Sequence, residues 1–116
     1  MQPLKRIEVA FFVGASGKEP VRDWLKSLPA GDRKIIGDDL QALEFGWPVG
    51  MTLCRPMGKG LFELRSTLPN RIARLLFIAV DERLVLLHGF IKKDRKTPKA
   101  DLDLARDRLK RMRGGR

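Results

Sequence analysis

In the first quarter of the chain, a strand-like spacing of apolar residues is followed by a helical spacing. Residues 6–13 form a strand-like run that ends at the Gly-Ala-Ser-Gly segment 14–17. Downstream, Val21, Trp24, Leu25 and Leu28 fall at the i, i+3, i+4 and i+7 spacing that places them on one face of a helix. Pro20 suits the first turn of that helix. The pattern therefore predicts a strand followed by a short amphipathic helix.

A second helix is predicted directly after the first. Asp32 is expected to cap it, and its apolar stripe is Ile36, Leu40 and Leu43. Gly46 closes the pattern. Two short helices joined by a tight link predict a helical hairpin that packs on a flatter element.

Three strand-like runs follow: Leu61–Leu68, Ile72–Val80 and Leu84–Ile91. The links between them are two or three residues long, which favours antiparallel hairpins because a parallel connection needs about a dozen residues. The middle run is the most continuously apolar, as expected of a strand that is buried on both faces.

The chain closes with a predicted helix that Thr97 caps and Pro98 opens, and its apolar side is Leu102, Ala105, Leu109 and Met112. The element order is then β-α-α-β-β-β-α. We predict an α+β fold in which a small antiparallel sheet carries an N-terminal helical hairpin and a C-terminal helix. At 116 residues the chain fits one domain, over residues 1–116.

Charge is the first indication of function. The chain carries 24 Lys and Arg against 14 Asp and Glu, a formal net charge of +10. Residues 92–116 hold 11 of those basic and 4 of those acidic side chains, so most of the excess lies at one end. This distribution suits a polyanion such as nucleic acid. A basic segment that serves only solubility is the alternative.

Other classes of protein find less support. The longest apolar run, Leu75–Val80, is far shorter than the roughly 20 residues of a membrane-spanning helix. The N-terminus makes a poor signal peptide, and Cys54, the one cysteine, excludes an internal disulfide. We therefore expect a cytoplasmic protein without a membrane partner. Phosphate-loop, dinucleotide, HExxH and GxSxG motifs are absent and the acidic residues are scattered, so neither a cofactor nor a metal is expected.

Arginines within the predicted strands are the first candidate site residues. Arg74 interrupts the central run, where burying an unpaired guanidinium would be very costly. One plausible hairpin register places Glu63 opposite Arg74 and Arg65 opposite Ile72, which gathers the charges on one face. A phosphate clamp fits this set, since the guanidinium fork suits a bidentate phosphate contact. A structural Glu63–Arg74 ion pair is the alternative.

A second candidate group follows the last strand-like run. An aromatic ring beside a dense run of cations is typical of single-strand RNA recognition, in which the ring stacks on a base and the cations contact phosphates. The alternatives are a core aromatic, a structural histidine and a solvated basic turn. The candidates for nucleic-acid binding are Lys59, His88, Phe90, Lys92, Arg95 and Lys96, and Lys93 joins Arg65 and Arg74 as a catalytic candidate.

An ordered series of motifs resembles a known family. The segments are Gly60–Arg65 (GLFELR), Arg74–Phe77 (RLLF), Leu86–Lys93 (LLHGFIKK) and Lys96–Pro98 (KTP). Together they resemble the HigB-like, phage-related branch of the RelE/ParE toxin superfamily, over roughly residues 5–112. This resemblance implies the toxin of a type II toxin–antitoxin module. Its partners would be a helix-turn-helix antitoxin, the ribosome and mRNA.

The resemblance also implies an activity, which is metal-independent cleavage of mRNA on the ribosome. By position, Arg65 and Arg74 match the strand arginines of the family, and Lys92 and Lys93 match its basic strand end. The tyrosine that RelE carries near its C-terminus has no counterpart, which leaves Lys59, Lys92 or Lys93 as the acid or base. A ParE-like poison of DNA gyrase and a non-enzymatic nucleic-acid-binding phage accessory protein remain alternatives.

Overall fold

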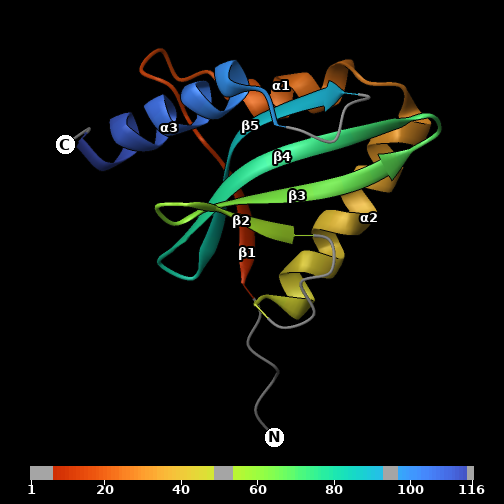
Figure 1. Cartoon of the computed structure of the whole chain (residues 1–116), viewed down its shortest axis with the longest axis horizontal. Helices are drawn as coiled ribbons and strands as arrows, with labels where there is room; N and C mark the ends of the chain where they lie inside the picture. Colours follow the sequence, from red (N-terminus) through yellow and green to blue (C-terminus); the bar gives the residue numbers. More distant parts are fainter. Residues whose placement is uncertain (1–6, 49–53, 93–96, 115–116) are drawn as a thin grey trace, which may run out of the picture.

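The computed structural model describes residues 7–48, 54–92 and 97–114. These residues form five strands and three helices, coloured along the chain in Figure 1. The elements are β1 (Glu8–Phe11), α1 (Pro20–Ser27), α2 (Ala30–Gly46), β2 (Cys54–Gly58), β3 (Leu61–Leu68), β4 (Arg71–Val80), β5 (Arg83–Lys92) and α3 (Lys99–Gly114). The predicted α+β class is confirmed.

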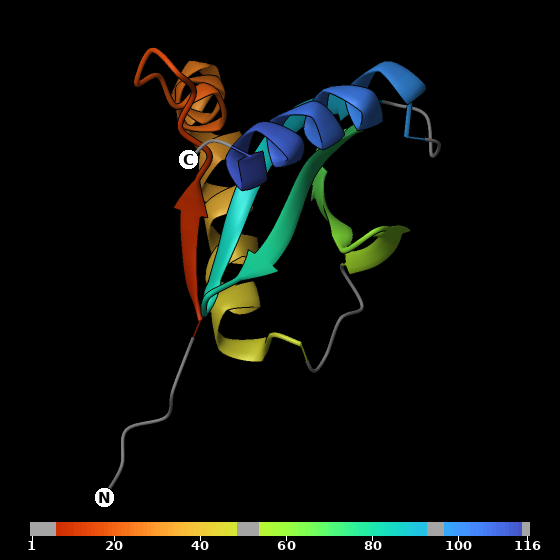
Figure 2. The same cartoon turned by 90° about the vertical axis from the view of Figure 1, so that its left-hand side faces the viewer.

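The strands form one sheet in the order β1-β5-β4-β3-β2. The pairs β2–β3, β3–β4 and β4–β5 are antiparallel, whereas β1 runs parallel to β5. Helices α1 and α2 cover one face of the sheet and α3 lies across the other, as the side view in Figure 2 shows. The sheet is therefore the middle of three layers, and each face has its own core.

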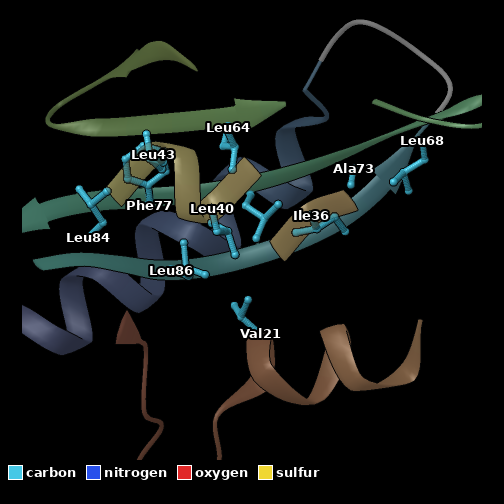
Figure 3. Packing of buried hydrophobic residues seen from close by; sticks show 11 residues of the cluster. Val21, Ile36, Leu40, Leu43, Leu64, Leu68, Ala73, Phe77, Leu84 and Leu86 are labelled. Carbon is cyan, nitrogen blue, oxygen red and sulfur yellow. The ribbon is translucent and has the colours of Figure 1, made fainter. Parts of the chain in front are cut away.

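The larger core lies between the sheet and the helical hairpin α1–α2. Val21 of α1 and Ile36, Leu40 and Leu43 of α2 supply the helical side, as their spacing predicted. Figure 3 shows these residues against Leu64, Leu68, Ala73, Phe77, Leu84 and Leu86 of the three central strands. The smaller core lies under α3, where Ala105 and Leu109 pack on the opposite face of the same strands. Strand β4 is thus buried on both faces.

A β-bulge in β5 explains how α3 is fixed to the sheet. His88 pairs with Leu76 and Leu86 with Phe77, which leaves Leu87 as the extra residue. The carbonyl oxygen of Leu87 accepts a hydrogen bond from Arg108 Nη1 of α3, at 2.8 Å. Burial lowers the pKa of the Arg108 guanidinium, and the neighbouring Asp107 carboxylate partly offsets that effect.

Three features of the fold differ from the sequence prediction. Strand β2 was missed, because its sequence, Cys-Arg-Pro-Met-Gly, has no alternation and contains a proline that only an edge strand tolerates. The parallel β1–β5 pair joins segments about 75 residues apart, beyond what local spacing can indicate. Asp32 does not cap helix α2, which begins at Ala30; its buried carboxylate instead accepts a hydrogen bond from Arg71 of β4 at 2.5 Å.

Candidate functional site

Arg65, Arg74 and Phe90 form one row across the three central strands, on the face that α3 covers. Arg65 of β3 pairs with Arg74 of β4, and Arg74 pairs with Phe90 of β5. The predicted register, with Glu63 opposite Arg74, is wrong by two residues. The tight Pro69–Asn70 turn closes the hairpin, because Asn70 adopts the positive φ of 62° that this turn needs. A shift of two residues keeps every side chain on the predicted face.

Glu63 joins the two arginines. Its side chain is fully buried, and Oε1 lies 3.2 Å from Arg65 Nε and 3.5 Å from Arg74 Nη1. Its other oxygen, Oε2, accepts a hydrogen bond from the hydroxyl of Thr97, just before α3. One carboxylate therefore connects strand β3, strand β4 and the segment that follows residues 93–96.

The two arginines differ in how far they reach solvent. The Arg74 side chain is fully buried and forms an ion pair with Glu63. The structural ion pair that we considered as an alternative is therefore present. The Arg65 side chain keeps 29% of its surface exposed while it contacts the same carboxylate. In this arrangement Arg65 is the guanidinium that an external phosphate can reach, and Arg74 lies behind it.

His88 and Phe90 pack beneath α3 beside this cluster. Phe90 is 9% exposed and belongs to the smaller core, in agreement with the core alternative. The two rings stack at a centroid distance of 5.4 Å. His88 Nε2 lies 2.7 Å from the Oδ1 atom of Asp101 in the first turn of α3. These contacts hold the start of α3 on the sheet. Because the Phe90 ring is buried beneath α3, it is not available to stack on an RNA base in this arrangement.

Several predicted site residues cannot be placed on this face. Lys93, Arg95 and Lys96 lie outside the described residues. Lys92 is the last residue of β5 and pairs with Ile72. Lys92 therefore lies two residue pairs beyond the row of Arg74 and Phe90.

Lys59 lies on the same side of the sheet but away from Arg65. It occupies the turn between β2 and β3, where Gly58, Lys59 and Gly60 all have positive φ. The side chains nearest to this turn come from the C-terminal half of α3. Four residues of β3, or about 13 Å, separate Leu61 at the end of this turn from Arg65.

Sequence reasoning missed the part that Thr97 plays. We predicted it as a helix cap, whereas its hydroxyl donates to Glu63 and α3 begins at Lys99. Asp101, the partner of His88, was also missed. A signal for the first contact was present, since the KTP segment forms part of the same ordered series as the ELR segment. No spacing rule links Asp101 to a strand 13 residues earlier.

Comparison with protein families adds an independent result. The model of the family described as "Phage derived protein Gp49-like (DUF891)" matches residues 23–110, which is most of the chain. The chain belongs to the phage-derived Gp49-like family. This family is part of the RelE/ParE-like toxin group and is associated with RelE-like toxins, which are endoribonucleases. No match was found among curated proteins.

The described part of the Gp49-like fold holds neither a metal-binding group nor a membrane-spanning helix. Across residues 7–48, 54–92 and 97–114, no three His, Cys, Asp or Glu side chains are grouped so as to hold a metal ion. None of the helices in these ranges is long and apolar enough to span a membrane.

Proposed function

We propose that this Gp49-like protein is the toxin of a type II toxin–antitoxin module and cleaves mRNA on the ribosome. The family's place in the RelE/ParE-like group supports the toxin assignment. The observation that carries the activity is the carboxylate-anchored guanidinium of Arg65. This guanidinium is partly exposed and is oriented by the buried Glu63. It lies on β3, two strands away from β5, the strand that precedes the basic segment.

The proposed reaction is an attack by a ribose 2′-hydroxyl on the adjacent phosphate. The 2′-oxygen forms a bond to phosphorus while a base accepts its proton, and the bond from phosphorus to the 5′-oxygen breaks as an acid protonates that oxygen. The products are a 2′,3′-cyclic phosphate and a 5′-hydroxyl. Negative charge increases on the phosphate during the attack, so a preoriented cation beside it lowers the barrier.

Each residue of the cluster has a role in this scheme. Arg65 contacts the phosphate, because its side chain is the exposed one. Glu63 and Arg74 position Arg65: the carboxylate fixes its Nε, and the buried Arg74 helps to balance the charge of that carboxylate. The proton transfers fall to Lys92 or Lys93, the lysines at the end of β5 and directly after it.

Induction in a bacterial host tests the toxin assignment. The wild-type protein should stop growth and the incorporation of labelled amino acids within minutes, and Arg65→Ala should accumulate to the same level without doing so. Continued growth with soluble wild-type protein would refute the proposal. Intact translation with failed chromosome segregation would instead indicate a topoisomerase target.

A further inference from the structure

Four basic side chains from the β2–β3 turn and helix α3 line a pocket that lies away from Arg65. It lies between the β2–β3 turn and the C-terminal half of α3, at the end of the molecule where both appear in Figure 1. The basic residues that line it are Lys59, Arg106, Lys110 and Arg113. No acidic side chain lines it within the described part of the chain.

The cations of this pocket are not used by the ion pairs that stabilise α3. Those pairs are Lys99–Asp103 and Arg111–Asp107, each one helical turn apart. Arg106 donates from Nη2 to the carbonyl oxygen of Met57 at 3.0 Å, and its buried Nε has no hydrogen-bond acceptor within the described residues. The positive charge of the pocket is thus left for a ligand to neutralise.

The backbone of the turn lies close to two of the guanidinium groups. A Cβ at Gly58 would lie 3.8 Å from Arg106 Nη2, and one at Gly60 would lie 3.9 Å from Arg113 Nη2. Both glycines have positive φ, so the turn favours the residue type that also leaves this space free. The guanidinium groups of Arg106 and Arg113 therefore lie next to the glycine backbone of this turn.

The lining distinguishes between two kinds of anionic ligand. Its leucines, Leu61 and Leu109, are only 1% and 6% exposed, so the apolar surface that a ligand meets belongs mainly to the carbon stems of the lysines and arginines rather than to large apolar side chains. An acidic protein segment normally needs apolar contacts at the centre of its interface, whereas phosphate groups of RNA bind through cations alone. The observations favour phosphate.

We propose that Lys59, Arg106, Lys110 and Arg113 form a second phosphate site that holds RNA at a distance from the cleavage site. This inference rests on the proposed function for its choice of RNA. It makes RNA binding separable from cleavage: the pocket contributes affinity, and Arg65 contributes chemistry.

Direct binding of an RNA that cannot be cleaved tests this site. The probe is a fluorescein-labelled, 2′-O-methylated RNA of 12 nucleotides, titrated at several salt concentrations and followed by anisotropy. For a single strand, the salt slope falls by about 0.7 for every phosphate that a variant no longer neutralises. The double variant Lys59→Gln, Arg113→Gln should therefore lower the slope by about 1.4 and weaken binding at least fivefold at low salt.

The matched control removes the same charge elsewhere. Lys26→Gln with Lys34→Gln changes two exposed lysines of α1 and α2, on the other face of the sheet, and should leave the slope unchanged. Equal losses in both double variants, or none in either, would overturn the proposal. So would a 12-residue glutamate peptide that displaces the RNA at equal concentration from the wild-type protein but not from the pocket variant. Because the probe is not cleaved, failure of the nuclease proposal would leave this result readable.

Discussion

At the scale of single residues, the buried carboxylate of Glu63 holds and compensates the charge of two arginines. It has no exposed surface and lies within 3.5 Å of both guanidinium groups. Removing one member of such a buried pair leaves the other charge without compensation, which costs about 3–5 kcal/mol. Removing the partly exposed Arg65 costs much less, because its charge is partly hydrated in the folded state.

This difference predicts the stability of three variants. Arg74→Ala and Glu63→Ala should each lower the free energy of unfolding by about 3–5 kcal/mol, and Arg65→Ala by about 1 kcal/mol or less. Urea denaturation measures all three. The double variant Glu63→Leu, Arg74→Met should lose less than either single alanine variant, since it removes both buried charges together. A double variant less stable than both would contradict the account of a costly unpaired charge.

The thiol of Cys54 provides a second prediction at this scale. Burial raises its pKa from 9.0 to about 11. At pH 8 roughly one folded thiol in a thousand is then the reactive thiolate, against about one in ten for an ordinary thiol. Reaction with a thiol-specific disulfide reagent should be slow at pH 8 and should accelerate at least about tenfold when concentrated urea unfolds the chain. Equal rates with and without urea would show that the thiol is not shielded.

At the scale of elements, a close contact between α1 and β5 restricts which residue can occupy position 89. A Cβ at Gly89 would lie 2.5 Å from Cζ3 of Trp24, so only glycine fits beneath the indole. The bulge at Leu87 places Gly89 on the face of α1 while His88 and Phe90 face α3. The register of β5 thus serves both helical layers.

Glycine substitutions test this contact with an internal control. Gly89→Ala should destabilise the protein by about 1–3 kcal/mol, because the indole ring or the strand must shift to relieve the clash. Gly37→Ala, in α2 with open space around its Cβ, should be neutral or stabilise by up to about 1 kcal/mol. Thermal denaturation of the two variants gives the comparison. Similar effects at both positions would refute the packing argument.

The contact between Thr97 and Glu63 predicts how the start of α3 is held. Thr97→Val removes the hydroxyl but keeps the shape, and should cost about 1 kcal/mol. Amide exchange should accelerate in the first turn of α3 and remain unchanged in α2. Thr67→Val, at an exposed position of β3, is the control. Protection of α3 that is equal in both variants would mean that the His88–Asp101 contact alone suffices.

The elements that the sequence predicted are those with a strong internal period. Helices α1 and α2 and strands β3 to β5 were found because their apolar residues repeat with a helical or strand spacing. Strand β2 carries no such repeat, and its pairing is determined by the turn at Lys59. That Glu63 and Arg65 share a face was predictable, because residues two apart in a strand point to the same side. The register that brings Arg74 beside Arg65 was not, because it depends on one turn residue, Asn70.

At the scale of the whole molecule, the charge of +10 determines how partners approach. The proposed function implies an antitoxin, which is expected to present an acidic segment, since complementary potentials speed encounter. Association should slow as salt rises, because screening shortens to about 8 Å near physiological ionic strength. Stopped-flow measurements over a salt series test this, and a rate independent of salt would exclude electrostatic steering.

Charge reversal then locates the surface that the antitoxin uses. Lys92→Glu with Lys93→Glu should weaken binding to the ribosome, because the two lysines no longer attract its phosphates. It should also slow antitoxin binding if the antitoxin covers this strand end. Weakened ribosome binding with unchanged antitoxin association would show that neutralisation acts from a separate surface.

The most direct test of the central claim is cleavage of mRNA on programmed ribosomes, with the new 5′ ends mapped by primer extension. We expect the wild-type protein to cut ribosome-bound mRNA and to leave the naked transcript intact. Arg65→Ala should cut about a hundredfold more slowly while keeping its fold, the loss that removal of one preoriented charge donor produces. Undiminished cleavage by folded Arg65→Ala, or no cleavage by the wild-type protein on any ribosome-bound mRNA, would contradict the account.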